Sequence, residues 1–206
     1  MRRKSLPRLY PIVDASFFPG SAEILAFVHQ LTAAGCRFLQ YRNKSGSARI
    51  MLEHSRQLRE AFDNSVQLIM NDRPDLCLAA DFNGVHVGQD DLSPEAVRVI
   101  IGPDRWLGVS THNPEQLTEA DLTLADYLAI GPVFATTSKE KPDPVIGLDG
   151  VRRARSLTGK PLVAIGGITR ANAASVIEAG ADSLAVISDL LKQPRKSAEE
   201  FFRVLG

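Results

Sequence analysis

The chain has 206 residues, of which 44% are hydrophobic and 23% are charged, and its 24 basic residues balance 24 acidic ones. A chain of this length can bury one sizeable core, so a single large domain is the simplest organisation. The equal numbers of positive and negative charges argue against a dedicated nucleic-acid-binding protein, which normally carries a basic excess.

The segment Met1–Lys4 is basic, and prolines at positions 7 and 11 interrupt the residues that follow it. The apolar core of a secretory signal cannot form across these prolines, so we expect no such signal here. No apolar run approaches the roughly 20 residues that a membrane-spanning helix needs. The two cysteines, Cys36 and Cys77, lack metal-binding spacing. We expect both to stay reduced in a cytoplasmic protein.

Short apolar or β-branched runs alternate with longer segments of helical periodicity from one end of the chain to the other. In one such segment Ile24, Phe27, Val28 and Leu31 have the i, i+3, i+4, i+7 spacing of a buried helix face. The predicted strands, in chain order, are Leu9–Val13, Phe38–Tyr41, Gln67–Met70, Gly84–Val87, Trp106–Val109, Tyr127–Ile130, Leu162–Ile165 and Ser183–Val186.

Strands that are each followed by a helix predict a parallel sheet, because parallel neighbours need crossover connections of helix length. Closing this sheet gives the α/β fold of a single-domain (β/α)8 TIM barrel that spans residues 1–206, a length near the short end for that fold. An open, doubly wound sheet is the structural alternative. No linker, low-complexity tract or change of composition marks a second domain.

In a TIM barrel the functional side chains lie at the C-terminal ends of the strands, so polar residues after each apolar run are the candidates. After the second predicted strand, Gln40, Arg42 and Lys44 would share one side of an extended chain. Two cations and an amide together suit a multiply charged anion such as diphosphate. For this cluster alone, a strand running into a charged surface turn is the simpler interpretation.

Carboxylates follow the third and fourth predicted strands, at Asp72 and at Asp90 with Asp91. Carboxylates from two adjacent strands could hold one hard cation, since Mg²⁺ typically takes one or two of them and completes its shell with substrate phosphate. Each could instead cap the next helix, Asp72 ahead of Pro74 and the later pair in competition with Ser93. Both interpretations remain open from these residues alone.

After the fifth predicted strand come Ser110 and His112. Ser110 could donate a hydrogen bond to a leaving diphosphate. For His112 we expect a structural or orienting role, because no Ser-His-Asp order surrounds it and nothing predicts a nucleophilic triad. Further on, Pro132–Gly147 has no helical periodicity, and its length and polar residues indicate a functional loop.

The seventh predicted strand runs into Gly166 and Gly167, and the eighth into Ile187 and Ser188. Glycines let backbone N–H groups approach an anion closely, and TIM barrels often bind phosphate with these last two loops. A tight turn is the alternative explanation for the glycine pair. Their place after the seventh strand favours a phosphate site.

Together and in this order, the clusters resemble the thiamine phosphate synthase family from Tyr10 to Leu191. No single motif is specific, but the set is. The residues that carry the resemblance are Gln40-Tyr41-Arg42-Asn43-Lys44, Asn71-Asp72-Arg73, Gly84-Val85-His86-Val87-Gly88-Gln89-Asp90-Asp91, Gly108-Val109-Ser110, Gly131-Pro132-Val133-Phe134, Thr136-Thr137-Ser138-Lys139 and Ala164-Ile165-Gly166-Gly167-Ile168.

The resemblance implies a transferase that joins aminopyrimidine diphosphate to hydroxyethylthiazole phosphate, both small molecules, with the help of Mg²⁺. It assigns the pyrimidine diphosphate to Gln40, Arg42, Lys44, Asn71, Ser110 and Lys139, and it assigns the metal to Asp72 and Asp91. Of these, Arg42, Lys44, Ser110 and Lys139 would be catalytic. It assigns the thiazole phosphate to Thr136, Thr137, Ser138, Gly166, Gly167, Ile187 and Ser188. Ala135 stands where the family usually has proline.

In the family the diphosphate is thought to leave first, and the thiazole nitrogen then captures a pyrimidinylmethyl cation, so no protein nucleophile is required. A thiazole tautomerase of the same superfamily, using His112, is the alternative enzyme. A catalytically silent barrel that binds thiamine precursors is the alternative of another class. Asp72, Asp91, Arg42 and Lys139 together favour the synthase over the tautomerase, which has no diphosphate to bind, and a complete set of charged groups is a poor match to a barrel that has lost activity. The sequence is compatible with a homo-oligomer and leaves the oligomeric state open.

Overall fold

A computed structural model describes residues 5–62, 65–136 and 143–206. Within these residues, eight parallel strands form a closed barrel in chain order, and the last strand pairs with the first. The strands are β1 (Leu9–Asp14), β2 (Phe38–Arg42), β3 (Gln67–Asn71), β4 (Gly84–Val87), β5 (Trp106–Thr111), β6 (Tyr127–Ile130), β7 (Leu162–Ile165) and β8 (Ser183–Val186). The predicted TIM barrel is confirmed, and the open sheet is excluded.

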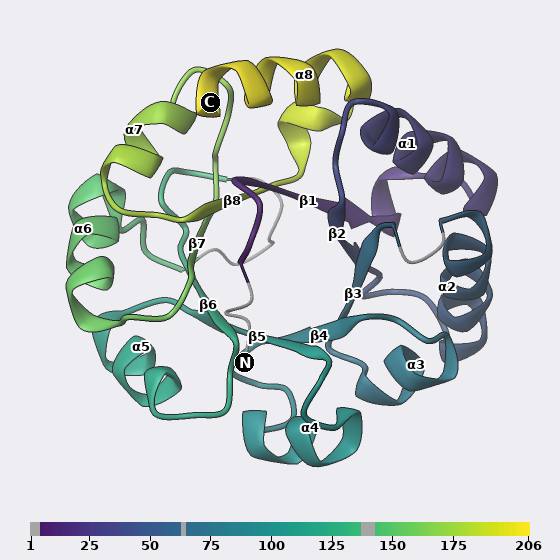
Figure 1. Cartoon of the computed structure of the whole chain (residues 1–206), viewed down its shortest axis with the longest axis horizontal. Coiled ribbons are helices and arrows are strands. Elements are labelled where there is room, and N and C mark those ends of the chain that lie inside the picture. Colours follow the sequence, from purple (N-terminus) through teal and green to yellow (C-terminus); the bar gives the residue numbers. More distant parts are fainter. Residues whose placement is uncertain (1–4, 63–64, 137–142) are drawn as a thin grey trace.

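Helices surround the barrel as an outer ring, which Figure 1 shows end on. They are α1 (Ser21–Ala33), α2 (Ala48–Ala61), α3 (Pro74–Ala79), α4 (Pro94–Ile101), α5 (Pro114–Asp121), α6 (Gly147–Leu157), α7 (Ala173–Glu178) and α8 (Pro194–Leu205), with short 3₁₀ turns η1 (Ala15–Phe17) and η2 (Ser188–Leu190). Helix α8 packs against both α1 and α7, which closes the ring where the two ends of the chain meet.

Several of these helices begin with proline. Proline has no backbone N–H, and this costs nothing in the first turn because the N–H groups there have no intrahelical acceptor. Ser93 caps α4 by accepting a hydrogen bond from the Ala96 N–H at 3.3 Å. The cap position of α3 is Arg73, whose side chain makes no capping bond. The alternative interpretation, in which Asp72, Asp90 or Asp91 caps the next helix, is therefore excluded, because Arg73 and Ser93 occupy the two cap positions.

Four strands are longer than their apolar runs predict. Strands β1, β2 and β3 each extend one residue further, to Asp14, Arg42 and Asn71, and β5 extends two residues, to Thr111. These polar residues remain in register with the neighbouring strand, as in the pairing of Asp14 with Arg42. Their backbone hydrogen bonds continue the ladder although their side chains are polar. A prediction based on apolar runs therefore places the ends of these strands too early.

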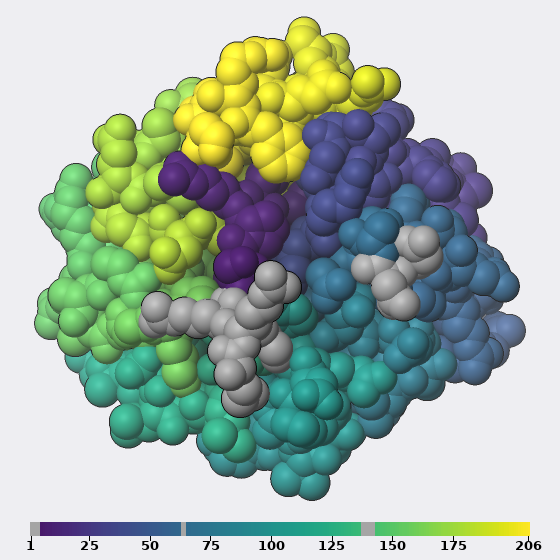
Figure 2. Space-filling model, in the orientation of Figure 1, coloured from purple at the N-terminus to yellow at the C-terminus, as the bar shows by residue number. Residues whose placement is uncertain are grey.

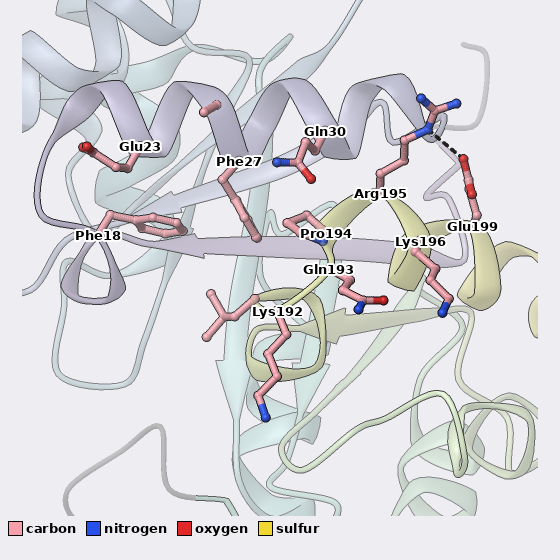
Figure 3. Close-up of a pocket in the computed structure, with 12 residues that line it drawn as sticks. Phe18, Glu23, Phe27, Gln30, Lys192, Gln193, Pro194, Arg195, Lys196 and Glu199 are labelled. Atoms are coloured by element: carbon pink, nitrogen blue, oxygen red, sulfur yellow. Dashed lines mark hydrogen bonds and ion pairs between the residues drawn. The ribbon is translucent and has the colours of Figure 1, made fainter.

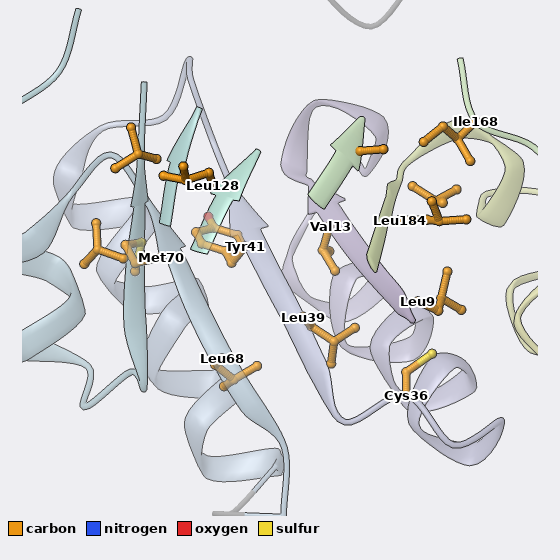
Figure 4. Packing of buried hydrophobic residues seen from close by; sticks show 14 of the residues in the cluster. Leu9, Val13, Cys36, Leu39, Tyr41, Leu68, Met70, Leu128, Ile168 and Leu184 are labelled. Atoms are coloured by element: carbon orange, nitrogen blue, oxygen red, sulfur yellow. The ribbon is translucent and has the colours of Figure 1, made fainter. Parts of the chain in front are cut away.

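Side chains of alternate strand residues face opposite ways and form two apolar layers. The outer layer lies between strands and helices, and Figure 4 shows part of it, with Leu9, Leu39, Leu68 and Leu184 packed together with helix-side residues. The inner layer fills the barrel. It consists of Tyr10, Ile12, Phe38, Ile69, Trp106, Tyr127, Ala129, Val163 and Ala185.

Aromatic rings fill the N-terminal half of the barrel interior. Phe38 meets Trp106 edge to face with ring centroids 5.3 Å apart. Glycine is required opposite these rings, because a Cβ on Gly108 would lie 2.1 Å from the ring of Tyr127. Leu6 packs onto this layer, and the purple residues that lead into β1 lie near the centre of the barrel end seen in Figure 2. The interior is thus closed at the N-terminal ends of the strands.

Both cysteines are free and buried, as expected. Among the residues described, none of the helices combines the length and the apolar character needed to cross a membrane.

Candidate active site

A cavity of about 500 Å³ lies at the C-terminal ends of the strands. Every strand of the barrel contributes to its wall, from Tyr10 and Ile12 of β1 to Ala185 of β8. The sequence-predicted site residues that line it are Gln40, Arg42, Lys44, Asn71, Asp72, Asp91, Ser110, Thr136, Gly166, Gly167, Ile187 and Ser188. Thr137, Ser138 and Lys139 lie outside the described residues.

A second cavity, of about 580 Å³, lies outside the barrel between α1 and α8 (Figure 3). Phe27 and Gln30 of α1 face Pro194 at the start of α8, and an ion pair of 2.9 Å joins Arg195 to Glu199 at its edge. None of the predicted site residues is among the described residues that line this groove. The polar cavity at the strand ends is therefore the candidate active site.

Two carboxylates meet in the cavity, as the strand ends suggested. The side chains of Asp72, directly after β3, and Asp91, in the loop after β4, are within hydrogen-bonding contact. Burial raises the pKa of the Asp72 carboxyl, Lys44 opposes this, and Asp91 raises the pKa further. Asp91 also accepts a 2.7 Å hydrogen bond from the Gly88 N–H. Such a pair of like charges is disfavoured unless a proton or a cation is shared between them.

Backbone strain marks the same place. Asp72 has φ of 62°, in the left-handed region that residues other than glycine adopt uncommonly, although aspartate and asparagine adopt it more often than most. Its N–H donates a 2.8 Å hydrogen bond to the carbonyl of His86, which holds this conformation against β4. Strained residues of this kind cluster at functional sites. With this backbone conformation, Asp72 lines the cavity and its carboxylate pairs with Lys44.

The two cations of the second strand both line the cavity, and each is paired with a carboxylate. The guanidinium of Arg42 binds Asp14, and the ammonium of Lys44 binds Asp72. Asp14 is 2% exposed and was not among the sequence candidates. It directly follows the apolar run Leu9–Val13, so the rule that selected the other strand-end residues would have found it. Its carboxylate holds Arg42 at the mouth of the barrel.

Polar side chains from the strands continue into the barrel beneath the cavity. Gln40 and His86 are both buried, and the His86 Nε2 lies 2.7 Å from the Ser110 Oγ. Burial lowers the pKa of His86 to about 4, so the ring is neutral at physiological pH. Tyr10 and Tyr127 link Gln40 to His86 through their hydroxyls, and no local sequence signal marked either tyrosine.

The opposite side of the cavity is formed by the loops after β6, β7 and β8. Gly166 and Gly167 have φ of 100° and 62°. A Cβ on Gly166 would lie 2.5 Å from the Pro132 Cβ, and one on Gly167 would lie 2.5 Å from the Ala135 carbonyl oxygen. The absence of a side chain at these glycines therefore lets the two loops approach closely, and it also permits the turn. Ile187 and Ser188, at the start of η2, line the cavity beside them.

His112 lines the cavity from the end of β5. Its Nδ1 lies 2.8 Å from the carbonyl oxygen of Gly131 and 3.5 Å from the carboxylate of Asp143. The backbone N–H of His112 donates to the Gln116 side chain. The imidazole thus links the loops after β5 and β6, which agrees with an orienting role.

Taken as a whole, the site combines cations and a carboxylate pair on one side with a glycine-lined loop pair on the other. Such a site can hold two anionic ligands at once, one of them multiply charged. The Ser110 hydroxyl contacts Nε2 of His86, but Nδ1 of that histidine contacts the Tyr127 hydroxyl and not a carboxylate, so these described residues do not form a nucleophilic triad.

The sequence model of the family described as thiamine monophosphate synthase matches residues 9–190. A thiamine-phosphate synthase of Koribacter versatilis (strain Ellin345) is 60% identical over 203 residues, which cover 97% of this chain and 96% of the relative. One of Chloroflexus aurantiacus is 46% identical over 88% of this chain and 83% of its own length. The solved structure of thiamine phosphate pyrophosphorylase from Pyrococcus furiosus superposes with a TM-score of 0.85 at 33% identity, covering 96% of this chain and 95% of its own.

Proposed function

The chain belongs to the thiamine monophosphate synthase family, and on that premise we propose how the cavity at the strand ends carries out the reaction. The activity is that of a thiamine-phosphate synthase, a transferase that acts on small molecules. The proposed substrates are aminopyrimidine diphosphate and hydroxyethylthiazole phosphate, and the products are thiamine phosphate and diphosphate. The observation that carries the assignment is the meeting of Arg42, Lys44 and the Asp72–Asp91 pair in one cavity.

The pyrimidine diphosphate occupies the side formed by β2 to β5. Arg42 and Lys44 offer positive charge to its diphosphate, and Ser110 offers a hydroxyl. Gln40 and Asn71 line the deeper part, where the pyrimidine ring lies. Lys139 belongs to this group by the family resemblance and lies outside the described residues.

The carboxylate pair fits Mg²⁺. The described residues contain no cluster of three or more histidine, cysteine or acidic side chains, so a purely protein-built metal cage is not available among them. Mg²⁺ needs only one or two protein carboxylates when substrate phosphates supply other oxygens. Asp72 and Asp91 would hold it, and Asp90 is the spare carboxylate. Bound there, Mg²⁺ would offset the negative charge that develops on the departing diphosphate.

The thiazole phosphate occupies the opposite side. Its phosphate binds the loops with Gly166, Gly167, Ile187 and Ser188, together with Thr136. Thr137 and Ser138 extend this set by resemblance and are outside the described residues. The glycines allow backbone to approach the phosphate where a side chain would block it.

The reaction then requires positioning and charge stabilisation instead of a protein nucleophile. The bond between the pyrimidine methylene carbon and the diphosphate oxygen breaks, and both electrons leave with the diphosphate. Arg42 and Lys44 stabilise that charge, and Ser110 donates a hydrogen bond to it. The thiazole nitrogen then supplies the electron pair for the new carbon–nitrogen bond. The apolar wall formed by Ile12 and Val163 limits water, which would otherwise trap the cation as an alcohol.

The tautomerase and silent-binder hypotheses lack support from any observation on the site, because neither explains why two carboxylates and two cations share one wall. We also propose that the protein acts in the cytoplasm, with which its two unpaired, buried cysteines agree.

The test is turnover of the purified protein with both substrates, in Mg²⁺ and in a chelator, following thiamine phosphate and diphosphate together. Asp91→Asn should lower Mg²⁺-dependent turnover by about 10- to 100-fold or more, because loss of a direct metal ligand should cost at least as much as loss of an outer-shell partner, which has effects of this order. Asp90→Asn is the matched control and should retain turnover. Equal losses in the two variants would remove Asp91 from the metal site.

The two halves of the cavity are tested separately. Ser188→Ala should raise KM for the thiazole phosphate about tenfold, as expected for one lost phosphate hydrogen bond, and leave KM for the pyrimidine diphosphate unchanged. An effect confined to the pyrimidine diphosphate would mean that the two substrate sites are reversed.

A further inference from the structure

Five polar side chains form a continuous hydrogen-bonded network through the inside of the barrel. Gln40 Nε2 lies 2.9 Å from the Tyr10 hydroxyl, and that hydroxyl lies 2.9 Å from the Tyr127 hydroxyl. The Tyr127 hydroxyl lies 3.0 Å from Nδ1 of His86, whose Nε2 lies 2.7 Å from the Ser110 Oγ. We call these residues the interior network. They come from strands β2, β1, β6, β4 and β5 in turn.

The interior network is largely buried, although Tyr10 and His86 lie in the wall of the cavity as Gln40 and Ser110 do. Tyr10, Tyr127 and His86 are 1%, 0% and 7% exposed. Gln40 and Ser110 both line the candidate active site. Because unpaired polar hydrogens are costly in such surroundings, each proton in the network must have an acceptor.

This requirement gives the network a direction. The Nε2 of Gln40 can only donate, so the Tyr10 oxygen accepts from it. Tyr10 must then give its single proton to Tyr127. Tyr127 in turn donates to Nδ1 of His86.

The remaining proton of the neutral imidazole is therefore on Nε2 of His86, and it is donated to the Ser110 Oγ. The Ser110 proton is then left free for the cavity. An imidazolium, or the Nδ1–H tautomer, would make Tyr127 an acceptor from His86. Tyr127 would then have to donate to Tyr10, which would leave the buried Tyr10 proton without an acceptor in the network.

We propose that the interior network is a positioning device that fixes hydrogen-bond polarity at both of its ends, so that Ser110 faces the cavity as a donor and Gln40 faces it with its carbonyl oxygen as an acceptor. A donor at Ser110 suits an anionic oxygen of the diphosphate. An acceptor at Gln40 suits an N–H of the aminopyrimidine. Tyr10, Tyr127 and His86 are then positioning residues for the pyrimidine diphosphate. The identity of that ligand rests on the proposed function, and the polarity itself does not.

The first test is made on the free wild-type protein and needs no turnover. Nitrogen NMR of protein labelled with ¹⁵N-histidine distinguishes the two neutral tautomers, and the His86→Gln variant identifies the His86 signals among those of the four histidines. The network requires the Nε2–H tautomer at pH 7. An Nδ1–H tautomer or an imidazolium would overturn the proposal whether or not the protein is active.

The second test compares two matched tyrosines. Tyr127→Phe removes one link of the network and keeps the ring. It should raise KM for the pyrimidine diphosphate about tenfold, the effect of one hydrogen bond, with KM for the thiazole phosphate within about twofold of wild type. The control is Tyr41→Phe, because Tyr41 is equally buried and its hydroxyl lies 2.9 Å from Nδ1 of His54 outside the barrel. This variant should keep both KM values within about twofold.

A Tyr127→Phe variant that matches Tyr41→Phe, or that raises both KM values equally, would contradict the positioning role. If Tyr127→Phe does not fold, the tautomer of His86 decides the matter alone. Absence of wild-type turnover together with the Nε2–H tautomer would refute the proposed function and leave the polarity of the network intact.

Discussion

The two ion pairs at the mouth of the barrel differ in how deeply their carboxylates lie. The side chains of Arg42 and Asp14 are 23% and 2% exposed, whereas those of Lys44 and Asp72 are 53% and 17% exposed. Removing one partner of a buried pair leaves an uncompensated charge, while an exposed pair contributes little to stability. Although both cations line the same cavity, only Arg42 is expected to contribute strongly to stability.

Arg42→Met should therefore lower the free energy of unfolding by about 3 kcal/mol, because it leaves the carboxylate of Asp14 buried without its partner. Lys44→Met is the matched control and should lower it by less than about 1 kcal/mol. Urea denaturation of both variants measures the difference. Equal and small losses would show that Asp14 finds another partner or takes up a proton.

At the scale of the strands, the shape of the barrel interior depends on where glycine faces an aromatic ring. Gly108 of β5 faces Tyr127 of β6, and Gly84 of β4 faces Trp106 of β5, where an added Cβ would lie 2.4 Å from the Trp106 Cβ. Gly108 makes room for the ring of Tyr127, and Gly84 makes room for the backbone and Cβ from which the Trp106 ring extends. The aromatic layer that closes the N-terminal end of the interior is therefore encoded by pairs of residues on adjacent strands.

Gly108→Ala should destabilise the protein by about 1–3 kcal/mol, the usual effect of overpacking a filled core. The comparison is Gly159→Ala, where a Cβ would meet no heavy atom within 4 Å and the change should stay within about 0.5 kcal/mol. Thermal unfolding followed by circular dichroism measures both. Wild-type stability of Gly108→Ala would mean that the Tyr127 ring can move aside.

For the whole molecule, stability depends on closing the ring. Strand β8 pairs with β1, and α8 packs against both α1 and α7. On α8, Phe201 is 0% exposed, while its neighbour Phe202 is only partly buried at the edge of the outer apolar layer. The last helix therefore joins the two ends of the chain instead of forming an independent appendage.

Phe201→Ala should accordingly lower the free energy of unfolding by about 3–5 kcal/mol, with a clearly smaller loss for Phe202→Ala. Trp106 is the single tryptophan and lies inside the barrel on β5, far along the ring from α8. We expect the unfolding transition of Phe201→Ala to shift by the same amount whether Trp106 fluorescence or far-UV circular dichroism follows it. A shift seen by circular dichroism alone would show that α8 unfolds separately.

Much of the fold was predictable because it rests on local patterns. Short apolar or β-branched runs located all of the described strands, and the strand-then-helix order predicted a parallel, closed sheet. The errors were confined to strand ends such as Asp14 and Asn71, where polar side chains stay in the ladder. The capping interpretation of Asp72 failed because Arg73, one residue later, occupies the cap position of α3.

The sequence by itself determined the barrel and the set of strand-end residues that share one cavity, because strand periodicity and residue chemistry are read along the chain. Only the tertiary structure decided which of these polar side chains pair with one another. Arg42 meets Asp14 across 28 positions, and Tyr10 meets Tyr127 across 117. Such pairs exist only once the sheet closes and brings distant strands within hydrogen-bonding distance, so no local pattern encodes them.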